Sequence, residues 1–176
     1  ACDAITKQKR LVSLGEIEGD DAPYRIDVVL NPDEGTLTVE DNGLGMSEEE
    51  LDRYINQIAL SGALDFINKY DQENENSGII GHFGLGFYSA FMVADKVEIY
   101  TKSYNGSPAV HWTCNEAGEF EMTGCDKSER GTKIVLHVTE EEKEFLVPER
   151  IEEILRKYCS FMTTEIYFKN TAETSE

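Results

Sequence analysis

Residues 81–97 of this chain read GHFGLGFYSAFMVADKV, and the interpretation of the fold starts from them. The stretch places Gly81, Gly84 and Gly86 directly before an apolar segment of helical character. Glycine lets backbone amides face a cavity without a side chain in the way. The N-terminus of a helix directs further free amides and a partial positive charge at the same place. The pattern predicts a phosphate cradle formed by these glycines together with Phe87.

The order of the glycines separates this loop from two common nucleotide-binding motifs. No Lys-Ser or Lys-Thr pair follows it, as a P-loop requires. The order G-x-x-G-x-G and the absence of a predicted βαβ unit are also unlike the dinucleotide-binding fingerprint. A hinge is the alternative interpretation, and the apolar segment directly behind the loop disfavours it.

A second glycine turn, DNGLGM, occupies residues 41–46. Asp41 ends a predicted strand, so its carboxylate can face a cleft. A carboxylate only accepts hydrogen bonds, and adenine offers an amine where guanine has a carbonyl. Asp41 is therefore the candidate for selecting adenine. A turn-forming role is the alternative, because Asp-Asn-Gly is a common turn sequence, and the glycine loop further along the chain favours binding.

The neighbours of Asp41 have simpler alternatives. Gly45 would let the backbone approach a flat base and Met46 would supply an apolar wall, but turn geometry and core packing also explain them. The hydroxyl of Thr132 could share the adenine contact, although the residues alone favour plain strand propensity. Asp3 and Lys7 share a helix face, for which a solvent-facing pair is the default. The three histidines receive no role.

Composition indicates one globular domain of 176 residues with a net charge of −19. Such an acidic chain argues against nucleic acid and anionic membranes as partners. No apolar run approaches the roughly 18 residues of a membrane helix, and no signal peptide is visible. Four widely spaced cysteines fit neither a zinc site nor a disulfide framework, which favours a reducing cytosol. The first residue is not Met, so we expect a fragment.

Local patterns predict the order of the elements. Runs of strands with helices gathered elsewhere indicate an α+β class, with a mostly antiparallel sheet and helices on one face. The domain is expected to span residues 1–170, with residues 171–176 as a polar tail or linker. Helices are predicted at 1–14, 47–58 (opened by a capping box), 64–70 and from Pro148; strands at 24–30, 36–40, 96–102, 110–113, 120–123, 131–138 and 165–169.

Four segments resemble the N-terminal nucleotide-binding domain of the Hsp90 chaperones, of the bacterial high-temperature protein G type. They are residues 1–4, 41–46, 81–97 and 130–133. The turn motif also occurs in gyrase B, MutL and sensor histidine kinases, whereas the run FGLGFYSAFMVADKV is far more specific and points to the chaperone branch. The resemblance implies the Bergerat-type ATPase fold, a two-layer α/β sandwich with a twisted sheet.

The resemblance also implies residue roles. Asp41 would bind the adenine amine, with Gly45 and Thr132 assisting through water, and Met46 and Phe87 would line the pocket. Asp3 would lie near the metal and its waters, and residues 60–84 would form an ATP lid. The implied nucleotide-contacting set is Asp3, Lys7, Asp41, Gly45, Met46, Gly81, Phe83, Gly84, Leu85, Gly86, Phe87 and Thr132.

Two departures from the family pattern qualify these roles. The family's first helix reads E-x-x-x-N-x-x-D-A, in which the Glu activates water and the Asn binds Mg²⁺. Asp3 and Ala4 match only its end, so we expect both residues upstream of Ala1, and this chain alone is not expected to hydrolyse ATP. Leu60 stands where relatives carry a Lys near the phosphates, so we expect unusual nucleotide affinity or lid behaviour.

The resemblance implies an ATP-dependent, stress-response chaperone. ATP would close the lid and favour association of two protomers. The implied cofactors are ATP or ADP and Mg²⁺, and the implied partners are unfolded or partly folded client proteins and a second copy of the intact protein, in the cytoplasm. A DNA-acting ATPase of the gyrase B/MutL branch is the alternative, which the charge disfavours. A histidine-kinase catalytic domain and a non-enzymatic nucleotide sensor are the remaining alternatives.

Overall fold

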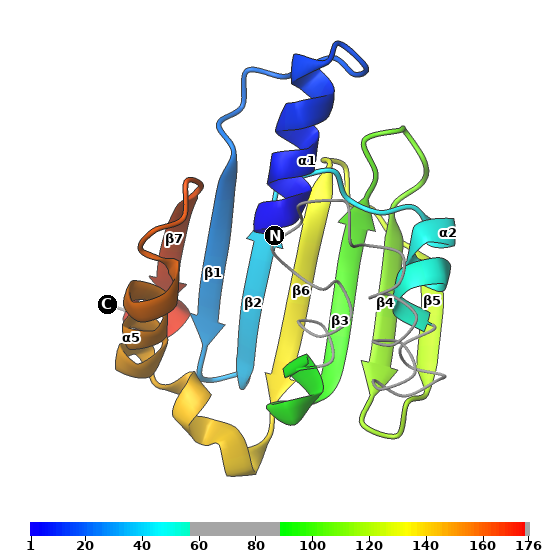
Figure 1. The fold of residues 1–176 in the computed structure, drawn as a ribbon. Helices are drawn as coiled ribbons and strands as arrows, with labels where there is room; N and C mark the ends of the chain where they lie inside the picture. The colour runs from blue at the N-terminus through cyan, green and yellow to red at the C-terminus, as the bar shows by residue number, and fades with distance from the viewer. Residues whose placement is uncertain (57–88, 175–176) are drawn as a thin grey trace, which may run out of the picture.

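The computed structural model describes residues 1–56 and 89–174, and within them the strands form one seven-stranded sheet (Figure 1). The strand order is β5-β4-β3-β6-β2-β1-β7. Neighbouring strands are antiparallel except β1 and β7, which are parallel. The strands are β1 (Arg25–Asn31), β2 (Thr36–Asp41), β3 (Ala94–Lys102), β4 (Val110–Asn115), β5 (Phe120–Gly124), β6 (Gly131–Val138) and β7 (Glu165–Asn170).

The helices α1 (Cys2–Ser13), α2 (Glu48–Leu51) and α5 (Pro148–Cys159) lie on one face of this sheet (Figure 1). Their starts follow from local sequence. Ser47 and Glu50 form the predicted capping box at the start of α2, and Pro148 occupies the first turn of α5, where its missing N–H costs nothing. The predicted α+β sandwich, mostly antiparallel with helices on one face, is confirmed.

Two apolar clusters fill the space between the layers. The α2 cluster joins Leu51 and Ile55 to the strands β3 and β4, with Trp112 fully buried at its centre. The α1–α5 cluster joins Ile5 and Ile151 to β1. Each buried Leu or Ile side chain stabilises the fold by about 1.5–3 kcal/mol, so these clusters fix the helices on the sheet.

Register brings the ends of three strands together. In the antiparallel ladders Asp41 of β2 lies opposite Thr132 of β6, and Thr132 lies opposite Thr101 of β3. The three residues therefore form a row across neighbouring strands at one end of the sheet. The alternation along β3, with buried Val97, Ile99 and Thr101, puts this row on the face that the helices cover.

The second predicted helix differs from the expectation. The α-helical part ends at Leu51 and continues as a π-helical turn, η1 (Asp52–Asn56). Asn56 is buried there: its Nδ2 donates to Asp52 Oδ1 at 2.7 Å, and its Oδ1 accepts from Trp112 Nε1 at 2.7 Å. The hydrogen bond from Trp112 on β4 thus accompanies the change from α-helical to π-helical backbone at the end of this helix.

The remaining differences concern short segments. After residue 88 the chain forms the 3₁₀ turn η2 (Ser89–Met92) and enters β3 at Ala94, so in the described part the predicted apolar helix is only this turn. Two more 3₁₀ segments follow, η3 (Glu140–Leu146) and η4 (Thr171–Thr174). Thr171 Oγ1 donates to the carbonyl of Leu30 at 3.1 Å. Among the described residues no helix combines the length and apolarity that a membrane span requires.

Candidate functional site

A buried polar row lies at one end of the helix-covered face, where apolar side chains would be the norm. Asp41, Thr132 and Thr101 are 7%, 6% and 0% exposed. The hydroxyls of Thr101 and Thr132 are 2.9 Å apart, and Thr101 Oγ1 accepts from the backbone N–H of Met46 at 2.8 Å. A carboxylate and two hydroxyls that hydrogen-bond to each other therefore share one buried corner, in which hydrogen bonds are stronger than in water.

The Asp41 carboxylate uses its two oxygens differently. Oδ1 accepts from the backbone N–H of Gly43 at 2.9 Å, so the turn-forming role considered from sequence is present. Oδ2 has the chain's N-terminal amine at 3.8 Å, which is too long for a hydrogen bond. Burial raises the pKa of Asp41 above its usual value, although the amine and the Gly43 N–H oppose that shift. Oδ2 retains capacity to accept from a ligand donor.

Residues 42–46 form a turn held between α1 and the end of β3. Asn42 accepts from the Arg25 N–H at 3.0 Å and donates to the Pro23 carbonyl at 2.9 Å. A Cβ on Gly43 would lie 2.6 Å from the backbone of Ala4, and one on Gly45, at φ +65°, would lie 1.8 Å from the Lys102 carbonyl oxygen. Close packing explains both glycines, and the contact of Gly45 with a base stays a prediction.

Arg130 completes the corner, although no role was predicted for it from the sequence. Its guanidinium donates to the carbonyl oxygens of Asn42 and Gly43 and pairs with Asp20 at 2.8 Å. Thr101 and Asn42 were missed in the same way. The only sequence signal was the place of Arg130, directly before the Gly131-Thr132 pair that the resemblance includes.

The other predicted contacts in the described part are two residues of α1 and Met46. Asp3 and Lys7 are on α1, and Ala1, the residue directly before this helix, approaches Asp41. Asp3 is half-buried, and Lys7 is exposed. Met46 packs against the α2 cluster, so core packing accounts for part of its role. The structure brings Asp41, Gly45, Met46 and Thr132 together, and their contact with a nucleotide stays a prediction.

The predicted phosphate end lies outside the described residues. This applies to Gly81, Phe83, Gly84, Leu85, Gly86 and Phe87, to Leu60, to the helix at 64–70, and to the expected lid. In residues 1–56 and 89–174, no group of three or more His, Cys, Asp or Glu side chains is arranged to hold a metal ion. The placement of Mg²⁺ therefore stays an expectation from the resemblance.

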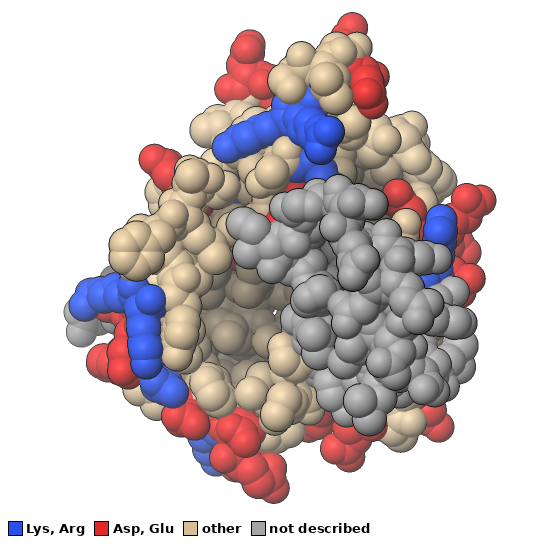
Figure 2. Space-filling model, viewed as in Figure 1, with Lys and Arg blue, Asp and Glu red and all other residues tan. Residues whose placement is uncertain are grey.

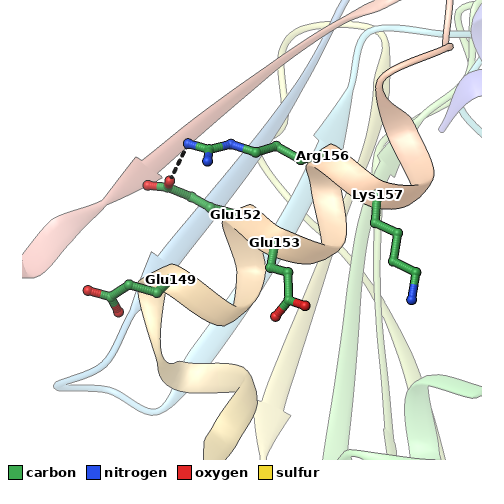
Figure 3. Close-up of a pocket in the computed structure, with 5 residues that line it drawn as sticks. All are labelled: Glu149, Glu152, Glu153, Arg156 and Lys157. Atoms are coloured by element: carbon green, nitrogen blue, oxygen red, sulfur yellow. Dashed lines mark hydrogen bonds and ion pairs between the residues drawn. The ribbon is translucent and has the colours of Figure 1, made fainter.

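A shallow depression lies on α5 in the described part of the structure, and it is not the candidate site. Its lining comes from one exposed helix surface, with Arg156 paired to Glu152 at 3.0 Å (Figure 3). Figure 2 shows Lys and Arg gathered in groups on this side of the molecule, with Asp and Glu around the rim. The pair between Arg156 and Glu152 joins residues four apart in the sequence, and ion pairs at this spacing are typical of solvated helix faces. The lining residues are Glu149, Glu152, Glu153, Arg156 and Lys157.

A second carboxylate cluster lies on the opposite face of the sheet. Glu98 of β3 has its Oε1 at 3.0 Å from His111 Nε2 and its Oε2 at 2.6 Å from His137 Nε2. Lys96 lies 3.9 Å away, and the Tyr100 hydroxyl donates to Glu98 at 3.3 Å. Burial alone would raise the pKa of Glu98, but the bonds from both imidazoles outweigh it and lower the pKa. Two histidines without an assigned role thus support one carboxylate.

Comparison with known proteins adds independent findings. A family model described as histidine kinase-, DNA gyrase B- and HSP90-like ATPase matches residues 19–145. Proteins named chaperone protein HtpG are similar over 98% of this chain: 47% identical in Porphyromonas gingivalis, 49% in Bacteroides fragilis and 48% in Bacteroides thetaiotaomicron. The chain spans 25% of the length of these curated relatives.

Proposed function

Because this chain belongs to the histidine kinase-, DNA gyrase B- and HSP90-like ATPase family and is an Hsp90-type domain within it, we propose that it binds adenine nucleotides as the N-terminal domain of an ATP-dependent chaperone. One observation supports the proposal above all: Asp41 is buried beside Thr132 and Thr101, and in the described part of the chain only one of its carboxylate oxygens accepts a hydrogen bond. A buried acceptor without a full set of donors is costly, and an adenine amine supplies the missing donor.

The geometry favours adenine over guanine. Asp41 Oδ2 accepts from the exocyclic amine of adenine, whereas the guanine carbonyl at that position would face a carboxylate and be repelled. The Thr132 hydroxyl and the backbone at Gly45 supply further polar contacts through water, and Met46 packs against the base. A site built around a buried hydrogen bond rejects a ligand that lacks the partner more strongly than an apolar pocket does.

We extend the proposal to the complete protein that carries this domain. It hydrolyses ATP to ADP and phosphate with Mg²⁺, closes its lid on ATP, and associates as a homodimer that acts on unfolded client proteins in the cytoplasm. Support comes from the chaperone relatives and from the acidic charge of −19. The same charge disfavours nucleic acid and membrane partners, and with them the gyrase B/MutL alternative.

Isothermal titration of the complete protein with ADP, adenosine and GDP tests the proposal. ADP and adenosine are expected to bind, and GDP is expected to bind at least about 10-fold more weakly than ADP. Equal affinity for GDP and ADP would remove Asp41 from base selection. A DNA retention assay at low salt tests the alternative, because strong retention would favour a DNA-acting ATPase.

Leu60→Lys tests the phosphate end of the same site. Introducing a cation at the position where the family pattern implies a Lys is expected to strengthen ATP binding and to leave adenosine binding unchanged, because only ATP carries phosphates. If the substitution leaves the affinities for both ligands unchanged, Leu60 has no part in the nucleotide affinity of this protein.

A further inference from the structure

We propose that Arg130 is a positioning residue for the adenine-binding carboxylate, acting on Asp41 through one peptide group of the turn that follows it. The proposal rests on the proposed function, because it assigns Arg130 to the same site. No ligand contact is assigned to Arg130 itself.

The peptide between Asn42 and Gly43 links Arg130 to the Asp41 carboxylate. Its N–H donates to Asp41 Oδ1 at 2.9 Å. Its carbonyl oxygen, on the other side of the same planar unit, accepts from Arg130 Nη2 at 2.9 Å and from Nε at 3.2 Å. Because a peptide unit is planar and rigid, fixing the carbonyl also fixes the direction of the N–H. The guanidinium thereby sets the orientation of the carboxylate.

Arg130 holds the next peptide and a distant loop as well. Nε also donates to the Gly43 carbonyl at 3.0 Å, and Nη1 pairs with Asp20 at 2.8 Å. Asp20 lies in the connection between α1 and β1. One side chain therefore joins the connection before β1, the turn after β2, and the start of β6.

The surroundings suit an arginine. The Arg130 side chain is only 17% exposed, so its hydrogen bonds compete little with water. A guanidinium presents several donors in a rigid fork, whereas a lysine ammonium is a flexible point charge. Hydrogen bonds from a charged donor are stronger than neutral ones. The neighbouring Gly131 allows the close approach, because a Cβ there would lie 2.1 Å from the Asp41 carbonyl oxygen.

The consequence is a specific defect at the base end of the nucleotide. Without the guanidinium the Asn42 carbonyl loses its partners, the peptide can rotate, and Asp41 Oδ1 loses its fixed donor. The carboxylate is then free to turn, so adenine meets a less organised acceptor. Adenosine and ADP share the base and differ in the phosphates, and both are expected to lose affinity to the same extent.

The test is calorimetry on the complete protein with adenosine and ADP, using Arg130→Gln and Arg130→Lys. Arg130→Gln is expected to weaken both ligands about 10-fold, the equivalent of one charged hydrogen bond, and Arg130→Lys is expected to recover part of the loss. In a protein that already carries Asp41→Asn, Arg130→Gln is expected to cost less than about 2-fold, because linked residues are not additive. Arg156→Gln, at an exposed ion pair on α5, is the matched control and is expected to bind normally.

Several outcomes would overturn the proposal. Normal adenosine affinity in Arg130→Gln would overturn it, as would the same 10-fold loss with and without Asp41→Asn, which would indicate a general structural role. If Arg130→Gln does not fold, Arg130→Lys and Asp20→Asn replace it, and wild-type affinity in both would overturn the proposal. Wild-type protein that binds neither adenosine nor ADP would instead contradict the proposed function.

Discussion

Asp41 and Glu98 both lie on strands of the same sheet, but their carboxylates have opposite surroundings. Asp41 lies on the helix-covered face, its side chain is 6% exposed, and it receives one backbone hydrogen bond, with the N-terminal amine 3.8 Å away. Glu98 lies on the other face, its side chain is 14% exposed, and two imidazoles, a lysine and a tyrosine hydroxyl surround it. Burial raises the pKa of Asp41, while the partners of Glu98 lower its pKa despite burial.

The difference separates the carboxylate proposed to bind a ligand from a structural one. Glu98 has donors on both oxygens, so its charge is compensated inside the folded chain and it stabilises the strands β3, β4 and β6. Among the described residues none donates a hydrogen bond to the second oxygen of Asp41, so part of its desolvation cost is left for a ligand donor to relieve. Perturbed carboxylates of the second kind concentrate at functional sites.

The largest expected effect is on nucleotide binding by Asp41→Asn. The amide can still accept one hydrogen bond but loses the charge, so we expect a loss of about 1.5–3 kcal/mol in ADP affinity. The free energy of unfolding should stay equal or rise, because a buried charge is removed. Calorimetry with ADP and urea denaturation measure the two quantities. An unchanged dissociation constant would falsify the adenine role of Asp41.

Glu98→Gln is the matched substitution on the other face and should give the reverse pattern. Removing the charge between two imidazoles is expected to lower the free energy of unfolding by about 1 kcal/mol, measured by urea denaturation. Adenosine affinity is expected to stay at the wild-type value. If Glu98→Gln weakened adenosine binding as much as Asp41→Asn does, the distinction between the two carboxylates would not hold.

The two carboxylates should also respond to pH with opposite sign. The folded pKa of Glu98 lies below its usual value of about 4.3. Its stabilisation is therefore present above that value and lost as the pH falls through the folded pKa. The folded pKa of Asp41 is raised. Its contribution is therefore fully present below about 3.9 and lost as the pH rises through the folded pKa.

Urea denaturation between pH 7 and pH 3 measures this pH dependence. The stability difference between wild type and Glu98→Gln is expected to shrink toward low pH, and so is any gain from Asp41→Asn. A gain from Asp41→Asn that persists below the pKa of Asp41 would show that its origin is not the buried charge.

The smallest expected effect belongs to His137→Gln. It removes one of the two imidazoles on Glu98, at a partly exposed position, so we expect a loss of about 0.5 kcal/mol in the free energy of unfolding. In the Glu98→Gln background the same substitution should cost almost nothing, because its partner has already changed. Equal costs in the two backgrounds would place the effect of His137 outside this cluster.

Local signals predicted most elements but not their irregularities. The hairpin at 24–40, the capping box at Ser47 and the helix from Pro148 follow from turn and cap chemistry, and the structure confirms them. The π-helical turn before residue 57 was not predictable, because it depends on a hydrogen bond between Asn56 and Trp112, which lie far apart in the sequence. The sequence could name only part of the buried corner. Asp41 and Thr132 lie in recognisable motifs, whereas Thr101 and Arg130 gave no signal of their own, because their contacts depend on strand pairing.

The sequence by itself determined the turns that identify the family and the order of strands and helices, because glycine positions, caps and hydrophobic periods act over a few residues. It also determined the acidic charge of the chain, which depends on composition alone. Only the tertiary structure decided which side chains meet. The row from Asp41 through Thr132 to Thr101, the grip of Arg130 on the Asn42–Gly43 peptide, and the pairing of Glu98 with two histidines all depend on strand register. Register is set by how distant strands pair and bury their faces, and no local preference of a single residue contains it.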